Sequence, residues 1–174
     1  MTTVNYSTRV EVTDAAVLAA IDGAIRLLED PRDLLQEIGD QLEANVALRF
    51  ETKTDPAGQK WAPLSEATKE IYQSDWFIKR NPAFKGGIPG SLLQRTNAMR
   101  QSLAFNVVDN VLELGFSRAT KGGRWEVSQL HETGTRNMPR RGILTADPTT
   151  GELGAQDQAA ILAIVNGQLG ALFG

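Results

Sequence analysis

The side chains best suited to chemistry are concentrated in one segment of the chain, Trp125–Leu144. This segment contains the only histidine, His131, and three arginines, Arg136, Arg140 and Arg141. Guanidinium groups form bidentate hydrogen bonds with phosphates and with carboxylates. The segment could therefore take part in catalysis, bind an anion or hold a protein partner, and the elements around it must decide among these roles.

A catalytic role for His131 has little support in the sequence. A nucleophilic triad needs a carboxylate that orients the histidine. Trp125–His131 is predicted to be a strand, and neighbouring residues of a strand point to opposite faces, which separates His131 from Glu132. The chain also lacks cysteine and any Gly-x-Ser-x-Gly segment that would expose a serine. A histidine that is hydrogen-bonded at the edge of the sheet is the favoured interpretation.

Metal and cofactor sites are not predicted either. Zinc sites normally use several histidine or cysteine ligands, and the chain offers a single histidine. Gly86-Gly87 and Gly122-Gly123 lack the lysine and the glycine spacing of phosphate-binding loops. An enzyme that processes phosphate or nucleic acid with His131 and the arginines is the weakest alternative. No catalytic, cofactor or metal residue is assigned.

Length and composition predict one domain, residues 1–174, with a packed core, because 41% of the 174 residues are hydrophobic. The longest apolar runs, such as Ile161–Val165, are too short to span a bilayer, so no membrane partner is expected. Met1–Tyr6 shows neither the basic leader nor the apolar run of a signal peptide. The lack of cysteine fits a reducing compartment.

Charge is unevenly distributed along the chain. The net charge is −3, but Glu11–Glu51 holds ten acidic and three basic residues, a net of −7. Arg118–Arg141 holds six basic and two acidic residues, a net of +4. An acidic protein is poorly suited to wrapping nucleic acid. The separation of charge suits head-to-tail contact between copies, and a solvated surface is the equally open alternative.

Apolar periodicity predicts three amphipathic helices. The first follows a cap at Thr13 or Asp14 and ends at Asp30-Pro31, because the residue before proline avoids the helical region. The second starts at Pro31 and runs to about Glu51. The third is Gln156–Phe173 near the C-terminus. Two shorter helical segments are also expected, at Ser65–Tyr72 and Leu92–Ser102.

Alternating apolar residues predict a small antiparallel sheet. Val4–Val12 reads as an N-terminal strand. Leu103–Val107 and Val111–Phe116 form a hairpin around the turn Asp109-Asn110, and Trp125–His131 adds a third strand to this meander. The expected fold is therefore α+β, with this sheet packed against the two N-terminal helices and the C-terminal helix.

The stretch from residue 73 to residue 90 lacks a regular pattern and is predicted to be a long extended loop or arm. Its aromatic residues Trp76, Phe77 and Phe84 are mixed with basic residues, glycine and proline. Aromatic side chains contribute most where they are buried. The segment is therefore expected to pack on a neighbouring molecule.

Five short segments follow one another in a fixed order along the chain: Arg49-Phe50, Asp55–Leu64 with Thr68, Leu93–Ser102, Leu130–Gly134 and Met138–Leu144. Together they resemble the phage virion morphogenesis family, which includes the tail completion proteins of contractile-tailed phages and their homologues in Mu-like phages. The similarity covers most of the chain. Asn97 stands where the family usually has glycine, which asparagine can replace because it also adopts left-handed backbone. Thr133 replaces a common aromatic residue.

The resemblance implies a structural protein of the virion, located in the tail or neck and assembled in the host cytoplasm. It implies a ring of identical copies around the DNA channel, six-fold by analogy with tail symmetry. Its other partners would be neck and tail proteins such as the connector and the tail tube, with packaged DNA close by. A transient assembly factor or chaperone that leaves before maturation is the main alternative.

Two groups of residues follow from this interpretation. The first group would contact a partner: Trp76, Phe77, Phe84, Arg136, Arg140 and Arg141. The second group would shape the fold: Trp61, Pro63, Thr96, His131, Gly134 and Pro139.

Overall fold

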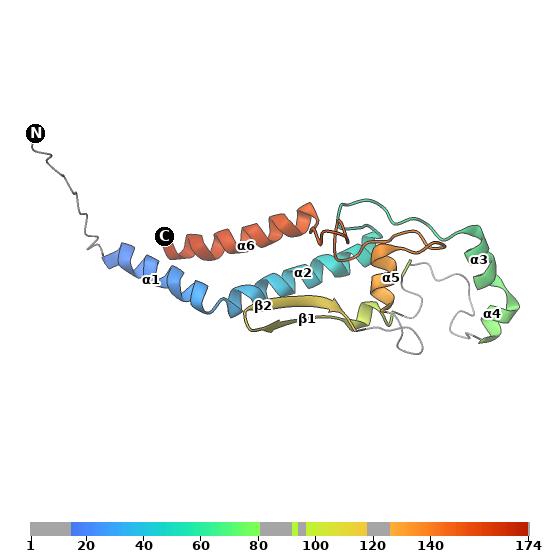
Figure 1. The fold of residues 1–174 in the computed structure, drawn as a ribbon, viewed down its shortest axis with the longest axis horizontal. Coiled ribbons are helices and arrows are strands. Elements are labelled where there is room, and N and C mark those ends of the chain that lie inside the picture. Colours follow the sequence, from blue (N-terminus) through green and yellow to red (C-terminus); the bar gives the residue numbers. More distant parts are fainter. Residues whose placement is uncertain (1–14, 81–91, 94–96, 118–125, 174) are drawn as a thin grey trace, which may run out of the picture.

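The computed structural model describes residues 15–80, 92–93, 97–117 and 126–173. The predicted N-terminal strand at Val4–Val12 lies outside these residues, as do Phe84 and Thr96. The described chain is α+β, with helices around one antiparallel hairpin (Figure 1).

Both N-terminal helices form where the apolar periodicity predicts them. Helix α1 spans Ala15–Glu29 and α2 spans Arg32–Thr52. Pro31 directly precedes α2, and its carbonyl accepts the first helical hydrogen bond, from Leu35 N at 2.9 Å. Lys53 ends α2 in a left-handed conformation (φ 57°), and its N–H donates to Arg49 O at 2.7 Å. Such a left-handed residue is a common way for a helix to satisfy its last carbonyls.

The predicted hairpin is also confirmed. Strand β1 (Leu103–Val108) pairs antiparallel with β2 (Val111–Phe116), and Val108 lies opposite Val111. The turn residues Asp109 and Asn110 both have positive φ, 50° and 61°. Two such residues give the turn whose twist matches that of the flanking strands.

Helix α2 is the central element of the fold. Figure 1 shows it between the hairpin on one side and α6 (Ala155–Phe173) on the other, and α6 confirms the predicted C-terminal helix. Gly39 allows the hairpin to approach, because a Cβ at this position would lie 2.4 Å from the ring of Phe105. The buried core at the C-terminal end of α2 consists of Val46, Phe50, Trp61, Met99 and Ile143.

The predicted third strand is wrong. Val127–Thr133 forms a short helix, α5, so the sheet of the described residues has two strands. The apolar residues Val127 and Leu130 are three positions apart, a spacing that also fits one face of a helix. A short segment of this kind does not distinguish helix from strand by periodicity alone, and tertiary contacts decide.

Two other predicted segments differ in detail. The expected helix at Leu92–Ser102 is not continuous, because Leu93 and Asn97 have positive φ (62° and 55°). Among its described residues, Arg100–Ser102 forms a 3₁₀ turn. Asn97 has left-handed backbone, a conformation that asparagine tolerates, and this explains how it can stand where the family usually has glycine. The expected helix at Ser65–Tyr72 is confirmed as α3 (Glu66–Gln73).

Part of the predicted arm is helical. Asp75–Arg80 forms α4, directly after α3, and residues 81–90 lie outside the described residues. Ser74 joins the two helices, and its hydroxyl accepts a hydrogen bond from Phe77 N at 3.3 Å. The helix therefore starts on a capping serine, a signal present in the sequence but hidden by the mixed pattern around it.

Candidate functional site

The segment that looked most like an active site is a structural strap, Met138–Thr145, held against α5 by one carboxylate. Glu132 accepts hydrogen bonds from the backbone N–H of Ile143 at 2.6 Å and of Thr145 at 2.7 Å. It also accepts one from the Thr145 hydroxyl at 2.7 Å. A carboxylate that binds several donors is held in place by them. Sequence reasoning missed this role because it placed Glu132 beyond a strand rather than on a helix.

Arg140 and Arg141 bind carbonyl groups of their own chain. The Arg140 guanidinium donates to Glu132 O and to Thr145 O, both at 2.8 Å. The Arg141 guanidinium donates to Ala62 O at 2.8 Å and to Pro63 O at 3.1 Å, and only 5% of the residue is exposed. Burial lowers the pKa of Arg141 from its ordinary value. Arg141 therefore lies inside the fold, where it ties the strap to the segment before α3.

Arg136 is the exposed arginine of this group. It lies at the tip of a tight turn in which Thr135 N donates to Met138 O at 2.8 Å. Pro139 follows this turn. Gly134 precedes it and ends α5, rather than a strand, with φ 72°. A Cβ on Gly134 would lie 2.9 Å from Arg140 N, so the return of the chain after the turn requires glycine here.

His131 lies on α5 and not at a sheet edge. Its Nδ1 is buried and has no hydrogen-bond partner among the described residues. Burial, together with the positive charge of Arg141, lowers its pKa to about 4. Its backbone carbonyl accepts a hydrogen bond from Arg141 N at 2.8 Å. The adjacent carboxylate of Glu132 is engaged with the strap, so the structure does not assemble a histidine–carboxylate pair here.

A buried ion pair fixes the far side of the strap. Arg49 of α2 contacts Asp157 of α6 at 2.5 Å, and its other terminal nitrogen donates to Ile143 O at 2.8 Å. Asn45 donates to the second oxygen of Asp157 at 2.9 Å. The Trp61 indole N–H donates to Gly142 O at 2.9 Å. The role of Asp157 could not be found from the sequence, because 108 residues separate it from Arg49.

The three aromatic residues predicted to contact a partner lie in different environments. Phe77 is buried and its ring lies 4.8 Å from that of Tyr72. Trp76 is 60% exposed, and the Arg80 guanidinium lies over its ring at 4.7 Å. Phe84 lies outside the described residues. Trp76 is therefore the aromatic side chain that α4 presents to solvent.

Within the described residues, no group of three or more histidine or acidic side chains is placed to hold a metal ion. A search of the same residues finds no helix that is both long enough and apolar enough to cross a membrane.

A comparison with known proteins identifies the family. The model of the phage virion morphogenesis family matches residues 12–169. The chain belongs to this family. No curated protein and no solved structure shows significant similarity to the chain. The family is one of virion morphogenesis rather than of enzymes, and membership indicates a role in phage head or tail assembly together with other virion proteins.

In this phage virion morphogenesis protein, the segments that carry the family resemblance build the core. Each of four segments supplies a buried residue to the same cluster: Phe50, Trp61, Met99 and Ile143. The ring of Phe50 meets that of Trp61 edge to face at 5.7 Å. These four residues are buried in the core and do not form an exposed surface.

Two exposed surfaces of the protein are candidates for such binding. The first is a row of large apolar side chains on α1, the α1 face, whose exposed fractions lie between 43% and 80%: Val17, Leu18, Ile21, Ile25 and Leu28. The second is the α3–α4 lobe, which exposes Ile71 and Trp76.

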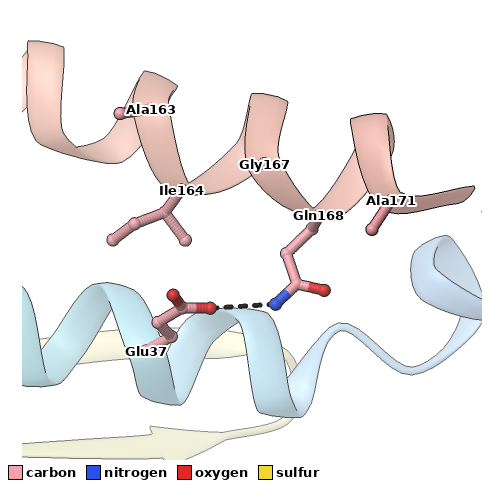
Figure 2. A pocket seen from close by; sticks show the side chains of 6 residues that line it. All are labelled: Glu37, Ala163, Ile164, Gly167, Gln168 and Ala171. Atoms are coloured by element: carbon pink, nitrogen blue, oxygen red, sulfur yellow. Dashed lines mark hydrogen bonds between the residues drawn. The ribbon is translucent and has the colours of Figure 1, made fainter. Parts of the chain in front are cut away.

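A groove between α2 and α6 is a further candidate binding site, separate from these two surfaces. It has a volume of about 360 Å³ and is lined by small and apolar residues of α6, with Glu37 opposite (Figure 2). Gln168 reaches across the groove and donates to Glu37 at 2.9 Å. This polar link joins the two walls. The residues of α6 that line the groove are Ala163, Ile164, Gly167, Gln168 and Ala171.

Proposed function

We propose that this protein completes the tail of a tailed bacteriophage or joins the tail to the head, as a ring of identical copies around the DNA channel. Its residues 1–174 act as one domain in this role. The membership of the family supports a function in head or tail assembly. Six copies would match the symmetry of phage tails. Neighbouring neck and tail proteins, such as the connector and the tail tube, would contact the two rims of the ring.

The observation that carries the proposal is the α1 face. Five large aliphatic side chains are at least 43% exposed on a single helix. Large contiguous apolar patches on a protein surface mark interaction sites, because burying them in an interface removes apolar area from water. A ring provides such burial between all neighbouring copies at once, through contacts whose rotation closes. The proposal thus explains why this face of α1 is exposed.

The placement of the protein in the virion is tested with purified particles. Mass spectrometry of mature virions is expected to find the chain at a constant copy number per particle, as for any ring component. A phage lacking the gene is expected to accumulate separate heads and tails, and the supplied protein should restore joining. If the chain is present in assembling extracts but absent from mature virions, it is a transient assembly factor and the proposed structural role is wrong.

A further inference from the structure

We infer that neighbouring copies join head to tail, with the α3–α4 lobe of one copy seated on the α1 face of the next. This inference rests on the proposed self-assembly and adds the two surfaces that would make the contact.

The α1 face forms one continuous stripe. Successive residues of a helix are about 100° apart, so its five side chains fall within an arc of about 100°. The adjacent side of α1 faces α6, where Ala20 is buried and where a Cβ on Gly23 would lie 2.8 Å from Leu172. The other edge of the stripe carries the exposed acidic residues Asp22 and Glu29, and Asp22 forms an ion pair with the exposed Arg26. The α1 face is thus an apolar strip, with Glu29 at its edge, that α6 leaves uncovered.

The α3–α4 lobe exposes apolar side chains next to basic ones. Ile71 is 52% exposed and Trp76 is 60% exposed. Lys79 and Arg80 at the end of α4 are also exposed, and Arg80 stacks over the Trp76 ring. Glu70 and Asp75 are exposed on the same lobe, so its basic charge is confined to the end of α4. Tryptophan and arginine are among the residues that most often dominate the energy of an interface. The lobe therefore offers an apolar anchor with a basic end.

Position and charge favour a second copy as the occupant of the α1 face. Figure 1 shows α1 at one end of the long axis of the molecule and α3–α4 at the other. Two different surfaces at opposite ends cannot meet within one chain, but they can meet between successive copies, which is a heterologous contact. Lys79 and Arg80 at the end of α4 complement the charge of Glu29 at the edge of the α1 face.

The absence of cysteine makes a direct test possible. Two single-cysteine variants, Leu28→Cys and Ile71→Cys, are purified separately, mixed at high concentration and oxidised. The expected product is the 28–71 cross-linked dimer, in several-fold excess over both homodimers. Val111→Cys, an exposed residue at the tip of the hairpin, is the control and is expected to cross-link poorly to either variant. The same variants are then cross-linked in extracts of infected cells, where assembling tails are present.

A charge exchange tests the complementary charges of the two surfaces. Lys79→Glu with Arg80→Glu is expected to weaken self-association about tenfold or more, since each factor of ten corresponds to about 1.4 kcal/mol. The double variant Asp22→Lys, Glu29→Lys reverses the acidic charges on α1. The first double variant is given Ile71→Cys and the second is given Leu28→Cys. Mixing the two is expected to restore the 28–71 cross-link. Lys60→Glu, a charge change on an exposed side chain outside both surfaces, is expected to leave association unchanged.

The outcomes separate this inference from the proposed function. A predominant 28–28 product shows a symmetric contact and overturns the head-to-tail arrangement. Cross-linking of position 28 only to another virion protein, or no 28–71 product in either setting, overturns it as well. In these cases the protein could still be found in mature virions, and the proposed function would stand. A strong 28–71 product from a chain that is absent from mature virions would instead support the contact and contradict the structural role.

Discussion

At the scale of single residues, the buried pair of Arg49 and Asp157 is expected to be costly to break. Both side chains are almost completely buried, with exposed fractions of 4% and 2%. Removing one partner of a buried pair leaves the other charge without compensation. We expect Asp157→Ala to lower the free energy of unfolding by about 3–5 kcal/mol.

Urea denaturation measures this loss. The matched control is Asp22→Ala, which removes the carboxylate that pairs with Arg26 on the exposed surface of α1. Exposed ion pairs contribute little, so this variant should unfold at nearly the wild-type urea concentration. Equal losses in the two variants would show that burial is not the source of the effect.

His131 makes the stability of the protein depend on pH. Its pKa in the folded chain, about 4, lies below the ordinary value of 6.5, so the unfolded chain binds more protons between these values. Stability is therefore complete above about pH 6.5 and is lost as the pH falls toward 4. We expect the urea concentration at the midpoint of unfolding to be lower at pH 5 than at pH 7. The His131→Gln variant should show a smaller decrease over the same pH range. Parallel pH profiles for the two proteins would contradict this assignment.

At the scale of elements, the junction of α5 with the strap depends on Gly134. Its backbone, with φ 72° and ψ 178°, belongs to a region that is essentially restricted to glycine. We expect Gly134→Ala to cost at least about 1–3 kcal/mol, because the added Cβ would also press on Arg140 N. Thermal unfolding monitored by circular dichroism measures the effect. Gly151→Ala is the control, since Gly151 also has positive φ but has open space around it, and it should lose less stability.

The structure gives Arg140 and Arg141 of the strap a different role from the one predicted from the sequence. From the sequence, Arg140 and Arg141 are predicted to contact a partner, so changing both to Glu would be a test of joining. The structure shows that both guanidinium groups hold backbone carbonyls of the chain and that Arg141 is buried. The double change would therefore unfold the strap, and a loss of joining would not show an interface. Arg136→Glu, at an exposed turn, is the informative substitution for a basic contact.

At the scale of the whole molecule, the α1 face should matter for assembly and not for folding. We expect the double substitution Leu18→Ser, Ile25→Ser to leave the circular dichroism spectrum nearly unchanged, because each residue is 46% exposed and neither belongs to the buried core. Infectious yield should fall about tenfold or more, since apolar area that would be buried between copies is lost. Complementation of a phage that lacks the gene measures the yield. Val108→Ser, Val111→Ser, on the exposed tip of the hairpin, should retain normal yield.

The sequence by itself determined those parts of the fold that depend on neighbouring residues. The bounds of α1, α2 and α6 follow from apolar spacing and from Pro31, and the hairpin follows from alternation around Asp109-Asn110. The order of the motifs also gave the family. These features are local or are read in chain order, so they do not require the packed structure.

The tertiary structure alone decided what the chemically suggestive residues do. Val127–Thr133 is a helix that the strap contacts through Glu132. Arg141 lies inside the fold, where it binds carbonyls of Ala62 and Pro63, about 80 positions earlier in the chain. Asp157 acquires its role from Arg49, 108 residues away. The packing of α6 decides which residues of α1 stay exposed, and the packing of α3 decides this for α4. Contacts between distant residues assign these roles, and no local pattern encodes such contacts.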